Sequence, residues 1–252
     1  MGNASPCPTP MTASKSISAY SGDLLANLME YRNAVGALQY LCNIRLDINF
    51  SIGKLSQFLS QPTTEHWKAM QRVLRYLRGT IHYGIHIKPA YTLDLAAFSN
   101  ANWASCPDDR RFVGGYYVFL GNSLVTWSSK KQAVVSRSSC ELKYRSLANT
   151  ASELNWIKSL LTELSLRLKN IPTIWCDNTN AAALAANPVH HARTKHIEID
   201  VHFVRDQVLS KLLKVQYVPT EFQLVDCLTK PLHHSRFWFL RDKLGVTVAP
   251  VK

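Results

Sequence analysis

The feature that most constrains the fold is a change in hydrophobic periodicity near residue 91. Before this point apolar residues recur at helical spacing, and after it short apolar runs alternate with helical segments. The predicted order of elements is strand, strand, strand, helix, strand, helix, strand, helix. A chain with this order forms a mixed sheet whose faces are covered by helices. We therefore predict an α/β fold with a mixed five-stranded sheet flanked by helices, preceded by a small helical segment.

The strands are expected to bring particular residues to one edge of the sheet. We expect strands over residues 93–104, 115–120, 123–129, 173–177 and 213–219, and later helices beginning at 138 or 139, 179, 194 and 222, the last reaching 244. Gly114-Gly115 and Gly121-Asn122 supply the turn chemistry for hairpins among the first three strands. In such sheets the functional crevice lies at strand ends near a change in strand order. The ends of the first and fourth strands are therefore the places to examine.

Composition along the chain predicts four segments. They are a disordered tail or linker at 1–28, a helical segment at 29–90, the mixed-sheet domain at 91–247 and a tail at 248–252. The first segment combines Pro6, Pro8 and Pro10 with serine, threonine and glycine, a composition that buries too little apolar surface to order itself. The second contains three short helices whose apolar faces need a partner, so we expect it to be the end of a larger domain.

The chain is basic, with 29 Lys and Arg against 17 Asp and Glu, a formal charge of +12. This balance favours a polyanionic partner such as nucleic acid, although some proteins are basic without such a partner. The third short helix carries Lys68, Arg72 and Arg75 at helical spacing, a stripe able to follow a phosphate backbone. A solvated outer face explains the same three residues.

Cysteine spacing and hydropathy exclude two classes of protein. The six cysteines stand far apart without paired spacing, which indicates neither a zinc knuckle nor a disulfide framework and favours a reducing compartment. No apolar run approaches the ~20 residues needed to cross a bilayer. We expect a soluble intracellular protein without membrane contact, and the sequence does not distinguish cytoplasm from nucleus.

Two acidic residues stand where a metal-dependent hydrolase needs them. Hydrolysis of phosphodiesters with divalent ions requires carboxylates that converge from several elements. Asp177 closes an apolar strand, but it is equally suited to cap the helix that follows. Asp226 stands near the start of the last helix, as a ligand or as an acid favoured by the helix dipole. Neither residue decides the question alone.

Several long motifs follow one another along the chain. Residues 127–148 (Trp127-Ser-Ser-Lys-Lys-Gln through Ser-Leu-Ala) resemble the third strand and first helix of the ribonuclease H domain in copia-type LTR retrotransposon Pol polyproteins. Residues 191–206 and 223–232 (Gln223-Leu-Val-Asp-Cys-Leu-Thr-Lys-Pro-Leu) are similar to its later part. Residues 31–41 and 66–80 resemble the end of the preceding reverse transcriptase. The resemblance covers nearly everything from residue 31 to residue 245.

This resemblance implies a ribonuclease H-like fold and a Mg²⁺- or Mn²⁺-dependent activity on the RNA strand of RNA:DNA hybrids. It also implies four carboxylates, which fall at Asn100, Lys143, Asp177 and Asp226. Asn100 stands where the family has Asp in Phe-Ser-Asp-Ala-Asp-Trp-Ala, and Lys143 where it has the Glu that precedes Tyr. Only Asp177 and Asp226 match the pattern.

The two departures predict weak or absent metal binding. An amide is a neutral and weaker ligand for a hard cation, and a lysine brings positive charge to a ligand position. Glu141 is the alternative, because aligning it with the family's Glu would keep three acids of four and retain weak activity. Two residues along a helix correspond to about 200° of rotation, which places Glu141 on another face than Lys143.

Several functions therefore remain open. The leading hypothesis is a ribonuclease H-like domain with absent or reduced hydrolysis. The alternatives are a weakly active hybrid nuclease that uses Glu141, a non-catalytic nucleic-acid-binding module and a decayed retroelement relic. We expect the clustered histidines, His190, His191 and His196, to serve the loop and the start of the following helix; the resemblance at most brings His196 near the scissile phosphate. The chain lacks a Tyr-x-Asp-Asp signature, so it is not a polymerase on its own, and a reverse transcriptase core outside this chain is the expected partner.

Overall fold

The computed structural model describes residues 4–14, 16–90, 92–102, 106–136, 138–186 and 197–248. They form two units, each with its own contacts. The first unit takes the described residues within 1–86, 105–110 and 230–252, and the second takes those within 87–104 and 111–229.

The second unit contains the mixed sheet. Its elements are β2 (Leu95–Asn102), β3 (Val113–Leu120), β4 (Ser123–Lys131), α4 (Ser139–Glu163), β5 (Thr173–Cys176), α5 (Thr179–Ala186), α6 (Glu198–Leu209), β6 (Lys214–Tyr217), η5 (Thr220–Phe222) and α7 (Asp226–Thr229). The strand order is β4-β3-β2-β5-β6. The first three strands pair antiparallel, whereas β2 with β5 and β5 with β6 pair parallel. The predicted α/β class, with a mixed five-stranded sheet flanked by helices, is confirmed.

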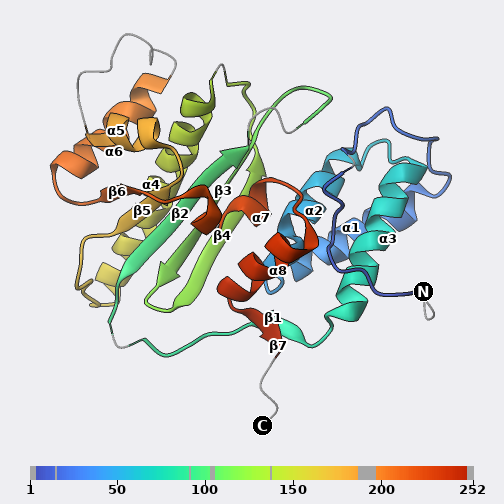
Figure 1. The fold of residues 1–252 in the computed structure, drawn as a ribbon, viewed down its shortest axis with the longest axis horizontal. Coiled ribbons are helices and arrows are strands. Elements are labelled where there is room, and N and C mark those ends of the chain that lie inside the picture. The colour runs from blue at the N-terminus through green and yellow to red at the C-terminus, as the bar shows by residue number, and fades with distance from the viewer. Residues whose placement is uncertain are drawn as a thin grey trace. The chain divides into compact units, whose positions relative to one another are not determined.

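Helix α4 covers one face of this sheet because its apolar residues recur at helical spacing. It packs against β2, β3 and β5, and also against α5 and α6 (Figure 1). The main core lies between these elements and includes Leu147, Ala151 and Leu154 from α4, Ala97 from β2 and Ile174 from β5. Burial of this apolar stripe holds the long helix in one rotational setting.

Helix α7 covers the opposite face, as two adjacent glycines of β3 show. Successive residues of a strand point to opposite faces. A Cβ at Gly114 would lie 3.5 Å from Ser146 Oγ of α4, and a Cβ at Gly115 would lie 3.2 Å from both Leu228 and Val225 beside α7. The sheet is therefore enclosed at this point, with no room for a side chain on the α7 face.

The first unit is mainly helical. Its elements are α1 (Leu28–Leu41), η1 (Leu46–Ile48), α2 (Asn49–Leu55), η2 (Ser56–Phe58), α3 (Thr64–Gly79), β1 (Tyr83–Ile85), α8 (His234–Lys243) and β7 (Val246–Val248). Strand β1 pairs antiparallel with β7, and the ring of Tyr76 in α3 meets that of Phe237 in α8 edge-on at 5.7 Å. These contacts group the C-terminal elements with the first unit, so the described residues divide differently from the continuous range 91–247.

The single helix expected over residues 222–244 is wrong. The chain forms η5, α7 and α8 instead, and Pro231 lies between the last two. Proline has no backbone N–H and its ring clashes with the preceding turn, so a helix cannot continue through it.

The N-terminal segment differs from the disordered tail expected at 1–28. Cys7, Thr9 and Met11 are buried, and the Cys7 N–H donates to the Arg75 carbonyl of α3 at 3.4 Å. Composition did not predict this order because the contacts come from side chains of α3 and α8, distant in sequence.

The close packing at Gly115 generates a stability prediction. A Cβ there would lie 2.7 Å from the Ser128 carbonyl oxygen, and neither backbone can yield without disturbing the β3–β4 pairing. We expect Gly115→Ala to lower the free energy of unfolding by about 1–3 kcal/mol, measured by urea denaturation.

The matched control is Gly36→Ala in the middle of α1, where an added Cβ meets nothing within 4 Å. Because alanine has the better helix propensity, this variant should gain about 0.5–1 kcal/mol. Equal stability of the two variants would contradict the packing argument.

Buried His66 generates a pH prediction for the first unit. Its Nδ1 accepts the Thr63 N–H at 2.9 Å, so the proton sits on Nε2, which donates to the Ser18 carbonyl at 3.1 Å. Burial lowers the pKa of His66; Lys54 lowers it further, while the Ser18 carbonyl and nearby acids oppose this. The neutral ring is thus the form that fits.

The unfolded chain therefore binds a proton at His66 more readily than the folded chain. The free energy of unfolding should fall as pH drops below about 6.5, the ordinary histidine pKa, and be constant with respect to this group above it. Urea denaturation across pH 5–8 measures this. His66→Gln should show a shallower acid loss, and an unchanged slope in that variant would sink the assignment.

Candidate catalytic site

The parallel pairing of β2 with β5 places two of the predicted residues side by side. Ser99 pairs with Cys176, so the next residues, Asn100 and Asp177, lie side by side where the β2–β5 pairing ends, while β2 continues along β3 to Asn102. This is the edge at which the strand-end argument placed the functional site. The two remaining residues arrive from α4 and α7.

Asn100 and Asp226 form a buried hydrogen-bonded pair. Their exposed fractions are 4% and 3%, and Asn100 Nδ2 donates to Asp226 Oδ1 at 2.9 Å. Asn100 Oδ1 accepts the N–H of Ala101 at 2.7 Å. The amide therefore presents N–H groups to the carboxylate, and its oxygen is bonded to backbone.

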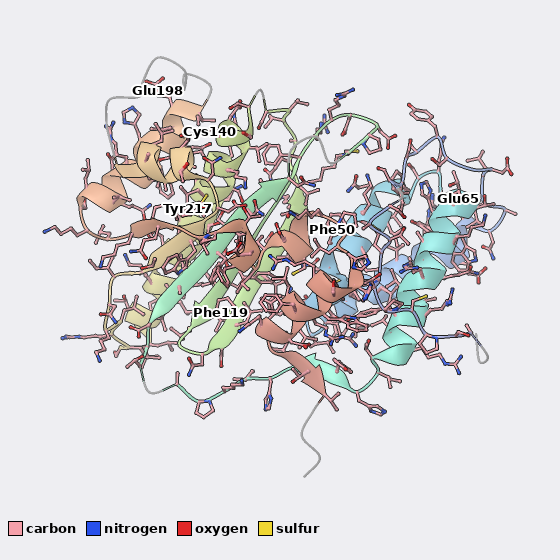
Figure 2. All side chains as sticks on the ribbon, in the orientation of Figure 1. Phe50, Glu65, Phe119, Cys140, Glu198 and Tyr217 are labelled. Atoms are coloured by element: carbon pink, nitrogen blue, oxygen red, sulfur yellow. The ribbon has the colours of Figure 1, made fainter. Side chains whose placement is uncertain are left out.

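Lys143 and Asp177 form an ion pair at the same edge. Lys143 Nζ donates to Asp177 Oδ1, and the side chains are 16% and 5% exposed. Lys143 projects from the first turns of α4, near Cys140, which Figure 2 labels at the start of that helix. The ammonium thus occupies the space beside Asp177 in which a cation bound by that carboxylate would lie.

Ser146 fixes the rotational setting of α4 one turn after Lys143. Its hydroxyl donates a hydrogen bond to the Asn100 carbonyl at 2.8 Å and accepts one from the Ser99 hydroxyl at 3.1 Å. These bonds tie the helix to the end of β2, so Lys143 reaches beyond the strand end to Asp177. The sequence analysis missed this serine, whose only signal was a polar residue on the apolar face of the helix.

Gln223 was also missed. It is fully buried; its Nε2 donates to the Ser99 carbonyl at 3.1 Å and its Oε1 accepts the Val225 N–H at 3.2 Å. It therefore anchors the turn that presents Asp226 to the end of β2. A buried amide is costly unless both its ends are bonded, which indicates a positioning role.

Asp177 and Asp226 were each open to a second interpretation, as a residue that stabilises the start of a helix. Asn178 Oδ1 accepts the Ala181 N–H at 2.8 Å, so Asn178 caps α5 and the helix-cap interpretation of Asp177 is wrong. Asp226 is the first residue of α7, where the helix dipole favours it, and it also contacts Asn100.

The Glu141 side chain bonds to a residue one turn later in the same helix, α4. Its Oε1 accepts from Arg145 Nε and Nη2, both at 3.3 Å. Arg145 also lies 4.0 Å from Asp200, whose pKa burial raises while the guanidinium opposes that rise. It is Lys143 that contacts Asp177.

The described residues do not fit the two divalent ions that the family resemblance implies. Each of the two carboxylates, Asp177 and Asp226, faces an N–H donor where a cation needs further oxygen ligands. Within the described ranges, no group of three or more His, Cys, Asp or Glu side chains could hold a metal ion. His196 lies outside the described residues.

The predicted nucleic-acid stripe on α3 is partly covered. Arg72 Nη2 donates to Thr9 Oγ1 at 2.9 Å, and Arg75 Nε donates to the Ser5 carbonyl at 2.7 Å. Lys68 is exposed and pairs with Glu65 at 2.7 Å. Lys68 is therefore solvated, whereas the two arginines are half-buried and bond to the N-terminal segment.

Comparison with known proteins identifies the family, although no family model matches the chain. The chain is 52% identical over 250 residues to the retrovirus-related Pol polyprotein from transposon RE1 of Arabidopsis thaliana, and 50% identical to that from RE2. It is 33% identical over 254 residues to that from TNT 1-94 of Nicotiana tabacum. These alignments cover 98–99% of this chain but 17–19% of the relatives.

Among solved structures, the comparison matches LC11-RNase H1 in complex with RNA/DNA hybrid at 8% identity and a TM-score of 0.40, covering 52% of this chain and 88% of that one. Another is a foamy viral protease-reverse transcriptase with double-stranded DNA, at 12% identity and a TM-score of 0.46, covering 79% and 33%. No helix in the described ranges is long and apolar enough to cross a membrane. The predicted family is confirmed by these relatives, and the predicted α/β class with a mixed five-stranded sheet is confirmed by the strand order. With half of its residues identical over nearly its whole length, the chain belongs to the retrovirus-related Pol polyproteins of copia-type transposons.

Proposed function

We propose that the second unit is a ribonuclease H-like domain that binds RNA:DNA hybrid without cleaving it. The observation that carries the proposal is the ion pair between Lys143 and Asp177. The resemblance places a catalytic Glu at position 143, and the side chain found there neutralises one of the two remaining acids. In the same proposal, the helical residues 29–90 are the end of the reverse transcriptase.

Electrostatics supports this loss of activity. Two unit charges about 4 Å apart interact by ~4 kcal/mol at the effective dielectric of a protein surface. The substitutions at Asn100 and Lys143 remove two attractive terms for a divalent cation and add one repulsive term. A Mg²⁺ or Mn²⁺ ion would also have to displace the ammonium from Asp177, and no hydrolytic step is therefore assigned to these residues.

Restoring the acids tests the proposal directly. We expect the unmodified chain to leave the RNA strand of a labelled hybrid uncut with either Mg²⁺ or Mn²⁺. We expect Asn100→Asp combined with Lys143→Glu to cleave it, because four carboxylates would then converge on the strand ends. Denaturing gel electrophoresis of the labelled RNA measures both.

The control is the same double variant with Asp177→Asn, which should be inactive while remaining folded by circular dichroism. Cleavage by the unmodified chain at the rate of the double variant would refute the loss of activity. If that cleavage disappeared in Glu141→Gln, the weakly active nuclease would be the better assignment. Hybrid binding that weakens steeply with salt separates a binding module from a relic.

The ion pair also predicts metal-independent stability. Lys143→Met should lower the free energy of unfolding by about 3 kcal/mol, because the Asp177 carboxylate would be left buried without its partner. The melting temperature of the unmodified chain should be the same in millimolar Mg²⁺ and in EDTA, whereas Mg²⁺ should raise that of the double variant.

Lys158→Met in the same helix is the matched control: Lys158 is half-buried and donates to the Leu212 carbonyl at 3.3 Å, away from the site, so the change should cost little. An equal loss in both methionine variants, or a melting temperature of the unmodified chain that rises with Mg²⁺, would contradict the assigned role of Lys143.

A further inference from the structure

A buried lysine and a buried cysteine are in contact within the first unit. Lys54 lies in the last turn of α2, the helix in which Figure 2 labels Phe50. Cys106 belongs to the segment 105–110, which the first unit takes from the connection between β2 and β3. The two residues are 8% and 2% exposed, and Lys54 Nζ donates to Cys106 Sγ at 3.6 Å. An amine and a thiol thus lie together, enclosed by protein.

The surroundings of Lys54 hold its side chain beside the sulfur. Its Nζ lies 5.4 Å from the centroid of the Phe58 ring, and a cation within ~6 Å of an aromatic ring is attracted to it. Phe58 stacks in turn on the His66 ring, with the two centroids 3.9 Å apart. In the described part of the chain, Lys54 pairs with no carboxylate.

A purely structural role does not account for this lysine. Lysine is almost never buried unless it is paired with an opposite charge, because removing an ammonium from water is costly. A methionine would fill a similar space without that cost. The chemistry available between an amine and a sulfur atom gives the pair a role that an apolar residue could not supply.

We propose that Lys54 and Cys106 form a redox-sensitive modification site, at which hydrogen peroxide converts the hydrogen-bonded pair into a covalent sulfur–nitrogen link, a sulfenamide. The link joins the end of α2 to the segment 105–110, and it is reversible by thiols. Both residues belong to the first unit, so this role does not depend on hybrid binding or on activity at the second unit.

The link forms in two steps. The Cys106 sulfur attacks one oxygen of the peroxide, the O–O bond breaks, and the departing oxygen leaves as water with the thiol proton; the product is a sulfenic acid. Lys54, after losing one proton to solvent, attacks the sulfenic sulfur as an amine. The S–O bond breaks and the oxygen leaves as water with a second proton from the nitrogen. The peroxide is reduced to water, and the linked pair has two hydrogen atoms fewer than the free thiol and amine.

Two thiol molecules reverse the link. The first attacks the Cys106 sulfur, breaks the S–N bond and forms a mixed disulfide while Lys54 regains its amine. The second attacks the mixed disulfide and releases Cys106 as a thiol.

The geometry favours capture of the sulfenic acid by Lys54 over further oxidation. The lysine stem has four rotatable carbons, so Nζ can close the remaining distance to the sulfur by rotation of its methylene groups. An amine held in contact reacts as an intramolecular partner, at an effective concentration far above that of dissolved peroxide. Cys106 should therefore form the link rather than the irreversible sulfinic and sulfonic acids.

Peroxide treatment of the full chain, followed by tryptic digestion and mass spectrometry, tests the proposal. We expect two peptides joined through Lys54 and Cys106, lighter than their sum by two hydrogen atoms and separated by dithiothreitol. The linked form should exceed the sulfinic and sulfonic forms of Cys106 by about tenfold or more. Cys42 is the control thiol in the same unit, because burial and nearby Asp47 raise its pKa to about 12, and it should stay unmodified.

Variants at the amine separate the link from simple thiol oxidation. Lys54→Arg keeps a positive charge but removes the nucleophilic amine, so the linked peptide should disappear. The fraction of Cys106 that dithiothreitol restores should then fall about tenfold, because the sulfinic and sulfonic acids are not reduced by thiols. Lys68→Arg on the exposed part of α3 is the matched control and should leave the link unchanged. Should Lys54→Arg misfold by circular dichroism, Lys54→Met makes the same test.

Two outcomes would overturn the proposal. One is oxidation of Cys106 in the unmodified chain to sulfinic or sulfonic acid with no peptide linked to Lys54. The other is a Cys106 that remains a thiol while the partly exposed Cys140 is oxidised. Neither outcome bears on Lys143 and Asp177 of the second unit, so a failure here is distinguishable from a failure of the proposed function.

Discussion

The parallel pairing of β2 with β5 is the constraint from which the geometry of the candidate site follows. It aligns Ser99 with Cys176, so the next residues, Asn100 and Asp177, lie side by side where this pairing ends. Parallel strands require a crossover connection, and here that connection contains the β3–β4 hairpin and α4. Because Ser146 ties α4 to the end of β2, the first turns of the helix return to the same edge and deliver Lys143 there.

Buried carboxylates at such an edge need partners, and their identity decides what the edge can do. A buried carboxylate without a partner is costly, and either a metal ion or a cationic side chain can neutralise its charge. In this chain Lys143 forms an ion pair with Asp177, and the Asn100 amide donates a hydrogen bond to Asp226. Under the proposed function, the strand ends therefore stay folded without a metal ion. The stability of the domain then does not depend on its catalytic activity. Such a domain can still present a surface to a hybrid.

The sequence predicted what local periodicity and turn chemistry determine. The five strands and α4 followed from apolar spacing, and the motifs located positions 100, 143, 177 and 226. Long-range contacts were not predictable: Tyr83 pairs with Val248, so a terminal strand joins an early one. The seating of residues 4–11 on α3 also comes from distant side chains. The contact between Lys143 and Asp177 joins α4 to the end of β5, and the serine that ties α4 to β2 gives no apolar signal in the sequence.

The basic residues behind the net charge of +12 do not all contribute equally to the attraction of a polyanion. A cation that faces a buried carboxylate, as Lys143 does, has its field largely cancelled and contributes little to attracting a polyanion. The field of Arg72 and Arg75 is not cancelled in this way, because the oxygens that accept their hydrogen bonds are neutral. The capacity to attract nucleic acid thus depends on which partner each basic residue has.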